Sequence, residues 1–265
     1  MRAAVLMYHA IPRRRDELEH ADPRYAVDAA GFRRHLREAR AMGRVVRAVR
    51  DLRRRPAERE RGAVGLTFDD GHETNFTQAF PLLMDEGATA DFFVNPSVVG
   101  STGFVTWAQL REMAAAGMSI QSHGYTHRYF DELSAREVRA ELHQSKAMIE
   151  DRLGVPVTLF APPGGRITGP VVEVARELGY EAVCTSRPGY WNGRGAGGGI
   201  PRLAVLAGTA PGTVAAWMGA RTGALAVQAT RFTMTRWAKR VLGNRRYDAM
   251  RSSLLRIAGR AGTTG

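Results

Sequence analysis

Short apolar runs alternate along the chain with longer stretches in which apolar residues recur every three or four positions. The short runs have the length of buried strands, and the longer stretches have the periodicity of amphipathic helices. Because strands that alternate with helices form parallel sheets covered by helices, the pattern predicts an α/β fold, either a barrel or a doubly wound sheet. The expected strands are 3–9, 44–49, 63–68, 88–94, 118–122, 157–161, 180–185 and 200–206, and the expected helices are about 28–42, 74–87, 106–117, 135–153 and 170–179.

The helix over residues 135–153 has the clearest boundaries. Ser134 is followed three residues later by Glu137, which is the spacing of a capping box at a helix start. Gly154 comes directly after the last periodic residue and is a natural stop. We therefore expect one long helix here.

The pattern changes near residue 208. The glycine-rich stretch 189–199 predicts a loop, and 200–206 is the last expected strand. After that point the sequence is basic and mostly helical in its periodicity. We therefore expect a first domain over residues 1–208 and a basic helical extension over residues 209–265.

The composition is that of an ordinary globular protein of 265 residues, with 44% hydrophobic and 24% charged residues. The single cysteine, Cys184, excludes an internal disulfide and suits a reducing compartment. The N-terminal apolar run ends at Pro12 with no small-residue cleavage site, and no run reaches the ~18 apolar residues of a membrane span. We therefore expect a soluble, cytoplasmic protein.

The net charge of +12 is concentrated in the extension, where ten basic residues and one acid, Asp248, follow residue 210. We expect no nucleic-acid partner, because no recognised binding module is present and basic and aromatic residues do not interleave outside the extension. The simplest interpretation of the extension is a helix packed on the first domain with a solvated basic face. The alternative is an interfacial helix that binds anionic lipid headgroups, which is a peripheral membrane association.

Polar residues follow several of the expected strands directly. In parallel α/β folds the carboxyl ends of the strands meet at one edge, where functional sites are built. These residues should therefore lie near one another. They are His9, Asp69, Asp70, the stretch 122–127, the stretch 162–165 and Arg202.

His123 and His127 have a spacing that can place two imidazoles on one metal ion. Together with one carboxylate they give a two-His, one-Asp set that leaves positions open, as hydrolytic metal sites require. Asp69 and Asp70 are adjacent like charges that should raise each other's pKa. A metal bound to one would offset the repulsion and leave the other as general base. Alone, such histidines are usually structural and Asp-Asp-Gly is usually a turn, but both at strand ends favour a metal site.

Several motifs of this chain resemble those of the polysaccharide deacetylases, which form carbohydrate esterase family four and carry the NodB homology domain. The resemblance covers about residues 3–206. It implies a distorted (β/α)7 barrel that removes N-acetyl groups from N-acetylhexosamine units of a polysaccharide or glycan precursor. The motifs are TFDDG (67–71), SHGYTH (122–127) and APPGG (161–165), with further likeness in LMYH (6–9) and the runs 81–94, 103–123 and 200–205.

The resemblance also implies a role for each matching residue. It makes Asp69 the catalytic base and Asp70, His123 and His127 the ligands of a divalent metal. Zinc is the expected ion, although cobalt, nickel and iron suit the same ligands. The metal would polarise the acetamide carbonyl and activate a water, whose proton Asp69 would remove.

The chain departs from the family pattern at the residue that orients the base. The third motif usually opens with an arginine, and Ala161 occupies that position. Arg166 or Arg202 is expected to substitute. For Arg166, a solvated loop residue is an equal alternative.

The general acid is also missing from its usual place. Many members carry it in a Leu-x-His motif near the C-terminus, and the region after Arg202 has no histidine. Our hypothesis is that His9, at the end of the first strand, is the acid, although a lone strand-end histidine is more often structural. His72 is the competitor, at a position that more often caps the following helix.

Two further regions are expected to face the substrate. A backbone N–H in the turn of Pro163 and Gly164 would hold the oxyanion, and Arg202 would lie beside them. Trp191 lies where the family pairs a tryptophan with an acid, and it would line the sugar site. The alternative is a loop tryptophan that covers the barrel mouth.

Two rival functions remain open. The chain could be a related amidohydrolase that acts on a different acyl group or a small amide. It could also be a degenerate barrel that binds glycan without cleaving it. A binder has no need of a base beside a metal, so the retention of Asp69 with all three ligands favours the enzyme.

Overall fold

The computed structural model describes residues 2–165, 167–193, 199–230 and 232–234. The chain divides into two compact units, Met1–Ala224 and Leu225–Gly265. The first unit extends beyond the expected boundary at residue 208, because Val214, Trp217 and Met218 of a short helix are buried in it. The predicted extension lies mostly outside the described residues.

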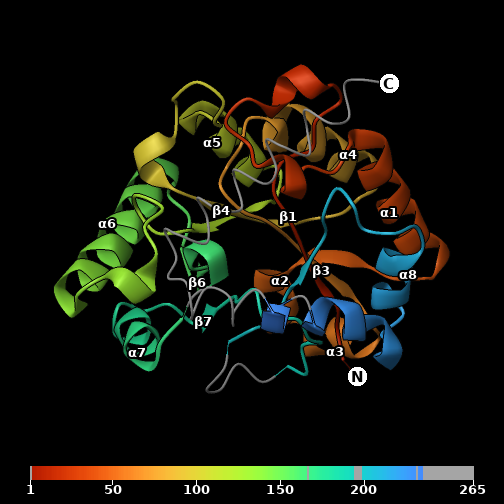
Figure 1. Ribbon diagram of the computed structural model, residues 1–265. Coiled ribbons are helices and arrows are strands. Elements are labelled where there is room, and N and C mark those ends of the chain that lie inside the picture. Colours follow the sequence, from red (N-terminus) through yellow and green to blue (C-terminus); the bar gives the residue numbers. More distant parts are fainter. Residues whose placement is uncertain (1, 166, 194–198, 231, 235–265) are drawn as a thin grey trace. The chain divides into compact units, whose positions relative to one another are not determined.

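The first unit is built on parallel strands, as the sequence pattern predicts (Figure 1). Seven of them follow the order β7-β6-β5-β4-β3-β1-β8, and β2 pairs with β3 beside this path. A parallel bridge between Cys184 and Ile200 brings the chain after β7 beside the chain before β8. This curled sheet confirms the predicted distorted (β/α)7 barrel. The strands are β1 Val5–Tyr8, β2 Val46–Ala48, β3 Val64–Phe68, β4 Asp91–Val94, β5 Ser119–Ser122, β6 Leu159–Phe160, β7 Ala182–Val183 and β8 Leu203–Ala204.

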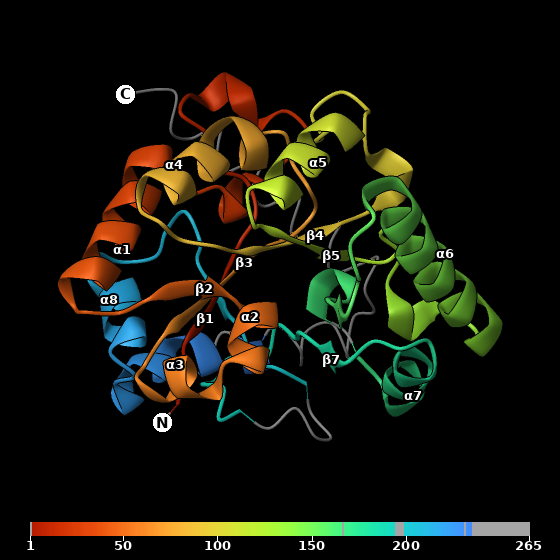
Figure 2. The same ribbon diagram turned by 180° about the vertical axis from the view of Figure 1, so that it is seen from behind.

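The helices α1, α4, α5, α6 and α7 follow one another around the outside of the strands (Figures 1 and 2). In contrast, α2 packs Val49 and Leu52 into a cluster with strand residues such as Phe93. The helices are α1 Ala29–Ala41, α2 Val49–Arg54, α3 Pro56–Glu60, α4 Phe80–Asp85, α5 Trp107–Ala115, α6 Ala135–Leu153, α7 Gly169–Glu177 and α8 Thr213–Met218.

The helix boundaries follow the local sequence. The capping box of Ser134 and Glu137 is present at the start of α6, and Gly154 ends the helix in the left-handed conformation. A π-helical turn over Asn75–Ala79 precedes α4. Pro81 lies in the first turn of α4, where its missing N–H costs least.

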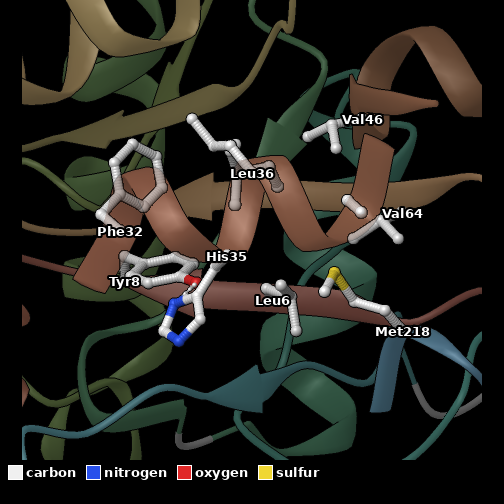
Figure 3. A pocket seen from close by; sticks show the side chains of 10 residues that line it. Leu6, Tyr8, Phe32, His35, Leu36, Val46, Val64 and Met218 are labelled. Atoms are coloured by element: carbon white, nitrogen blue, oxygen red, sulfur yellow. Dashed lines mark hydrogen bonds between the residues drawn. The ribbon is translucent and has the colours of Figure 1, made fainter. Parts of the chain in front are cut away.

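Successive residues at the end of β1 face opposite sides of the sheet, as in any strand. Tyr8 points toward α1, where its hydroxyl shares a 3.0 Å hydrogen bond with Nδ1 of His35 (Figure 3). Burial lowers the pKa of His35 to about 4, so this histidine is neutral at pH 7. The same side chains line a cavity of about 10 Å³, which is at the lower limit for one water. The next residue, His9, therefore faces the opposite side of the sheet, where the candidate active site lies.

No helix among the described residues is long and apolar enough to cross a membrane.

Candidate active site

The three side chains predicted to be metal ligands converge just beyond the carboxyl ends of β3 and β5. Oδ1 of Asp70 lies 3.2 Å from Nε2 of His123 and 3.2 Å from Nε2 of His127. The ligand atoms of the three residues all lie within 4.8 Å of one another. The fold therefore brings together the two-His, one-Asp set expected from the sequence.

Two of these residues have an unusual backbone conformation. Asp70 has φ +73° and His127 has φ +62°, which is the left-handed region. Few non-glycine residues adopt it, although Asp, Asn and His do so several times more often than others. Gly71 is also left-handed, and a Cβ there would lie 3.2 Å from the Val94 side chain. The chain thus turns sharply after β3 and presents the Asp70 carboxylate to the histidines.

His123 is held from the side opposite the carboxylate. Its Nδ1 lies 2.7 Å from the carbonyl oxygen of Ala161, and its backbone N–H donates to the carbonyl of Val94. A carbonyl can only accept, so Nδ1 carries a proton and Nε2 is the ring nitrogen that faces Asp70. A hydrogen bond from one ring nitrogen to a carbonyl orients metal-binding histidines in the same way.

A positive charge between Asp70 and His123 would stabilise their facing groups. When Nε2 of His123 carries no proton, its lone pair and a carboxylate oxygen of Asp70 are both acceptors, and they lie 3.2 Å apart. A proton or a metal ion at this point makes the arrangement favourable. The donor set therefore fits a divalent cation, for which two imidazoles and one carboxylate are suitable ligands.

The pKa values reflect the same electrostatics. Burial alone would raise the pKa of Asp70, but hydrogen bonds from His123 and His127 hold it well below its ordinary value. Burial lowers the pKa of His127, and the hydrogen bond and charge of Asp70 reverse this, so that the pKa lies above its ordinary value. The cluster thus stabilises an ionised carboxylate beside positive charge.

Asp69 makes a different set of contacts from its neighbour. Its two carboxylate oxygens accept from Nη1 and Nη2 of Arg202 at 2.6 and 2.8 Å, and both residues are buried. Burial would raise the pKa of Asp69, but the charge of Arg202 keeps it below its ordinary value. The two aspartates therefore divide: Asp70 faces the histidines, and Asp69 faces an arginine.

Arg202 is itself held by several groups. Its Nε donates to the carbonyl of Thr185 and its Nη1 to the hydroxyl of Thr67, while its guanidinium carbon lies 5.3 Å from the centre of the Phe93 ring. Of the two arginines expected to substitute at the Ala161 position, Arg202 contacts Asp69, and Arg166 lies outside the described residues. Because Arg202 has no exposed surface, it supports Asp69 and does not itself meet a substrate.

His9 lies next to Asp69 at the end of the neighbouring strand. Tyr8 and Phe68 are paired in the β1–β3 register, and the N–H of Asp69 donates to the carbonyl of Tyr8. Burial lowers the pKa of His9, and the charges of Asp70 and Asp69 oppose this. His9 is therefore part of the site, while its role as general acid remains a prediction.

His72, the competing candidate, has a structural role. Its Nδ1 lies 2.9 Å from the Thr74 hydroxyl, and its Nε2 lies 3.0 Å from the carbonyl oxygen of Glu19. The side chain is buried with both ring nitrogens engaged. It anchors the loop after β1 to the turn after β3.

The turn of Pro163 and Gly164 follows β6, as expected for the oxyanion region. The N–H of Ala161 donates to the carbonyl of Ser122, which places this chain segment beside the strand that ends at His123. Gly164 is left-handed, and Pro163 is buried. Their part in holding an oxyanion remains a prediction.

The expectation for Trp191 is wrong. Its backbone pairs with Ala3, just before β1, through two hydrogen bonds of 2.8 Å. The side chain is 1% exposed in a core cluster, with the Arg59 guanidinium over its ring. The catalytic candidates lie at the other end of β1, so Trp191 neither lines a sugar site nor covers the barrel mouth.

Three residues near the site were not predicted from the sequence. The Tyr25 ring packs on the His9 ring with 4.4 Å between centroids. The Asn95 side chain donates to the carbonyls of His123 and Gly124. Glu141 accepts three hydrogen bonds from the loop between the two histidines. Of these, only Glu141 had a readable signal, because it is an acid on the apolar side of a helical pattern.

The fold and the site together define a class: a parallel α/β barrel with a two-His, one-Asp cluster and a second carboxylate beside it. Residues 57–183 match the family model described as polysaccharide deacetylase. The resemblance carried by the motifs is thereby confirmed, and the barrel is that of the polysaccharide deacetylase family.

Similar proteins include enzymes with named substrates. The chain is 32% identical to the peptidoglycan-N-acetylglucosamine deacetylase of Bacillus cereus over 46% of its own length and 56% of the relative's. It is 33% identical to chitin deacetylase 1 of Cryptococcus neoformans over 45% of its own length and 24% of the relative's. The chain spans about half the length of the first curated relatives that it matches, 48% and 56%.

Among solved structures, the Streptococcus pyogenes deacetylase PplD in complex with acetate superposes with a TM-score of 0.72 at 25% identity. This match covers 80% of the present chain and 95% of PplD. The likeness thus includes nearly all of a deacetylase barrel.

Proposed function

We propose that this protein is a metal-dependent hydrolase that removes N-acetyl groups from N-acetylhexosamine units of a polysaccharide or glycan precursor. One observation carries the proposal. Asp69, bound by the buried Arg202 at 2.6 and 2.8 Å, directly precedes Asp70 in the ligand cluster. A protein that only binds glycan has no use for an ionised carboxylate fixed beside a metal site.

The names of the relatives support the substrate class. One is a peptidoglycan-N-acetylglucosamine deacetylase and another a chitin deacetylase. The residues that match the polysaccharide deacetylase family model, 57–183, include Asp69, Asp70 and both histidines. We therefore propose a carbohydrate with N-acetylhexosamine as the substrate.

The metal would be held by Asp70, His123 and His127, and we propose zinc. When bound, a divalent cation supplies Lewis-acid chemistry that polarises a carbonyl and makes water a stronger nucleophile at neutral pH. Asp69 is the general base that takes the proton of the attacking water. Arg202 keeps Asp69 ionised and fixes the direction of its oxygens.

The remaining groups act on the substrate. A backbone N–H in the turn of Pro163 and Gly164 stabilises the oxyanion, because a fixed dipole at this point needs no reorganisation during the reaction. His9, which lies next to Asp69 at the end of the neighbouring strand, delivers the proton to the leaving amine.

The association of the basic extension with a membrane surface also remains a proposal.

The first experiment combines metal analysis with an acetate assay. Purified wild type and His123→Ala are measured for metal by elemental analysis and for acetate release from N-acetylglucosamine oligomers. About one metal per chain in wild type, its loss in His123→Ala and acetate release by wild type alone would support the proposal. Metal without acetate would redirect the search to another acyl group or a small amide. No metal after reconstitution with zinc would contradict the mechanism and favour a glycan-binding barrel.

A second experiment tests His9. His9→Ala is expected to lower kcat by about 10²–10⁴, the usual contribution of a general acid. His72→Ala is the control, because both its ring nitrogens are engaged in structural bonds. If His9→Ala stays within a few fold of wild type, another group protonates the amine.

A further inference from the structure

The loop that carries both histidine ligands is held by a buried carboxylate from a distant part of the chain. Oε2 of Glu141, in α6, accepts the backbone N–H groups of Tyr125 and Thr126 at 2.7 and 2.9 Å. Its Oε1 accepts the hydroxyl of Thr126. Glu141 therefore binds the two residues that immediately precede His127.

Glu141 occupies a position where an apolar residue would be expected. It is 7% exposed and lies on the buried side of α6, beside Val138 and Leu142. Among the described residues, no cation forms an ion pair with it. A buried carboxylate is costly unless hydrogen bonds compensate it, and here the three loop donors do so. Its hydrogen bonds are thus directed entirely at the ligand loop.

The loop needs such support because its conformation is strained. His127 has φ +62°, and residues held in this region persist only when their surroundings determine them. Gly124 is left-handed too, and a Cβ there would lie 3.0 Å from the Phe130 ring and 3.5 Å from Oε2 of Glu141. The loop is therefore packed directly against the carboxylate that binds it.

The opposite edge of the loop has a separate anchor. The Asn95 side chain donates to the carbonyls of His123 and Gly124 at 2.7 and 3.2 Å. Asn95 thus fixes the first histidine ligand, which Ala161 also orients. His127 is 46% exposed at its side chain and has no comparable partner of its own among the described residues besides Asp70. Its position depends on the residues before it.

We infer that Glu141 is a positioning residue, which holds Tyr125 and Thr126 so that the strained His127 presents Nε2 to the metal. This inference rests on the proposed metal site of Asp70, His123 and His127. Partners of this kind commonly change metal affinity by 10–100-fold when they are removed. The effect should therefore appear in metal binding itself, before any reaction.

The test measures zinc affinity by competition with a chromophoric chelator, on the metal-free full chain. Glu141→Ala is expected to weaken zinc binding by about 10–100-fold. Glu141→Gln should stay within about threefold of wild type, because its oxygen can accept both N–H groups while its amide donates to the Thr126 oxygen. The absorption spectrum of the Co²⁺-loaded protein should change in Glu141→Ala and be restored in Glu141→Gln.

Glu150→Ala is the matched control. Glu150 lies in the same helix and also accepts a loop backbone N–H, that of Val157 at 2.9 Å, but that loop carries no ligand. Its loss should leave zinc affinity unchanged. Thermal unfolding of the metal-free variants measures any general loss of stability. Such a loss would affect both alanine variants alike.

Wild-type zinc affinity in folded Glu141→Ala, or an equal loss in Glu150→Ala, would overturn the inference. If Glu141→Ala does not fold, Thr126→Val decides, since it removes one of the three bonds at an exposed site. Weaker zinc binding by Thr126→Val supports the inference, and unchanged binding overturns it. A wild type that binds zinc but releases no acetate contradicts only the proposed function, whereas a wild type without zinc affinity overturns both.

Discussion

Asp69 and Asp91 are both enclosed by the barrel, with 3% and 0% of their surface exposed, and yet they have opposite acidities. Asp69 follows β3 and is paired with Arg202, and its pKa lies below the ordinary value. Asp91 begins β4 and accepts the N–H groups of Val49 and Arg50 at the start of α2. Burial raises the pKa of Asp91 to about 6 despite these bonds and one from Ser119.

The two pKa values differ because the hydrogen-bond partners of the two aspartates differ in charge. Both carboxylates lose their hydration and both are hydrogen-bonded. Neutral donors offset only part of the cost of burying a negative charge, whereas a guanidinium held at 2.6 and 2.8 Å offsets all of it. The barrel thus keeps one buried aspartate ionised beside the proposed metal ligands and uses the other to cap a helix.

The largest difference should appear in activity. Asp69→Asn is expected to lower kcat for acetate release by about 10²–10⁴, because it removes the general base. Asp91→Asn should stay within a few fold of wild type, because it bonds α2 and Ser119 and none of the proposed ligands. Comparable losses in the two variants would show that Asp69 acts through stability and not through chemistry.

Removal of the Arg202 guanidinium should make the Asp69 carboxylate costly to bury. Arg202→Met is expected to lower the free energy of unfolding by about 3–5 kcal/mol, since it leaves an uncompensated buried charge. The double variant Asp69→Asn, Arg202→Met should recover part of this loss. Urea unfolding of wild type, both single variants and the double variant gives the coupling free energy. A strictly additive result would mean that the pair is not coupled.

The pH dependence of stability should have opposite signs for the two aspartates. The folded chain binds the Asp91 proton more tightly than the unfolded chain. The stabilisation is therefore complete below about pH 4 and is lost as the pH rises through 6, with a total of about 3 kcal/mol. The pKa of Asp69 is lowered, so its stabilisation is present at neutral pH. The stabilisation is lost as the pH falls below the ordinary pKa of an aspartate.

Urea unfolding between pH 4 and 7 tests this assignment. The stability of wild type should fall relative to Asp91→Asn as the pH rises, because the variant lacks the titrating group. Parallel curves for the two proteins would contradict a raised pKa at Asp91.

A smaller effect should follow from the loss of Ser119, the side-chain hydrogen-bond partner of Asp91. Ser119→Ala is expected to lower the stability at pH 7 by about 1 kcal/mol, the usual net value of one hydrogen bond. The loss should shrink below pH 6, where Asp91 is protonated in either protein. Ser145→Ala is the control, because it removes a buried 2.8 Å bond to the Ser122 hydroxyl with no carboxylate involved. Its cost should not change with pH.

Much of this arrangement could be predicted from local patterns. All eight expected strands are present, although each is shorter than its apolar run, because the runs extend beyond the paired residues at one or both ends. The position of Asp69, Asp70, His123 and His127 at the strand ends followed from the parallel topology alone. Local signals suffice where one strand and its following turn supply the residue.

Long-range contacts set the limit of that prediction. Arg202 pairs with Asp69 across 133 residues of sequence, and nothing local distinguishes it from Arg166. Trp191 is flanked by loop residues, and its pairing with Ala3 depends on the way the barrel closes. Glu141, by contrast, could have been found, because its place between Val138 and Leu142 on one helical face marks a buried acid.

The left-handed backbone at Asp70 has an evolutionary consequence. Asn tolerates φ +73° about as well as Asp, whereas most other residues would strain the turn after β3. A single-step change to Asn would remove the charge of this proposed metal ligand and keep the chain path. Descendants of this barrel that lose their chemistry but keep their fold should therefore carry Asn at this position more often than any other residue.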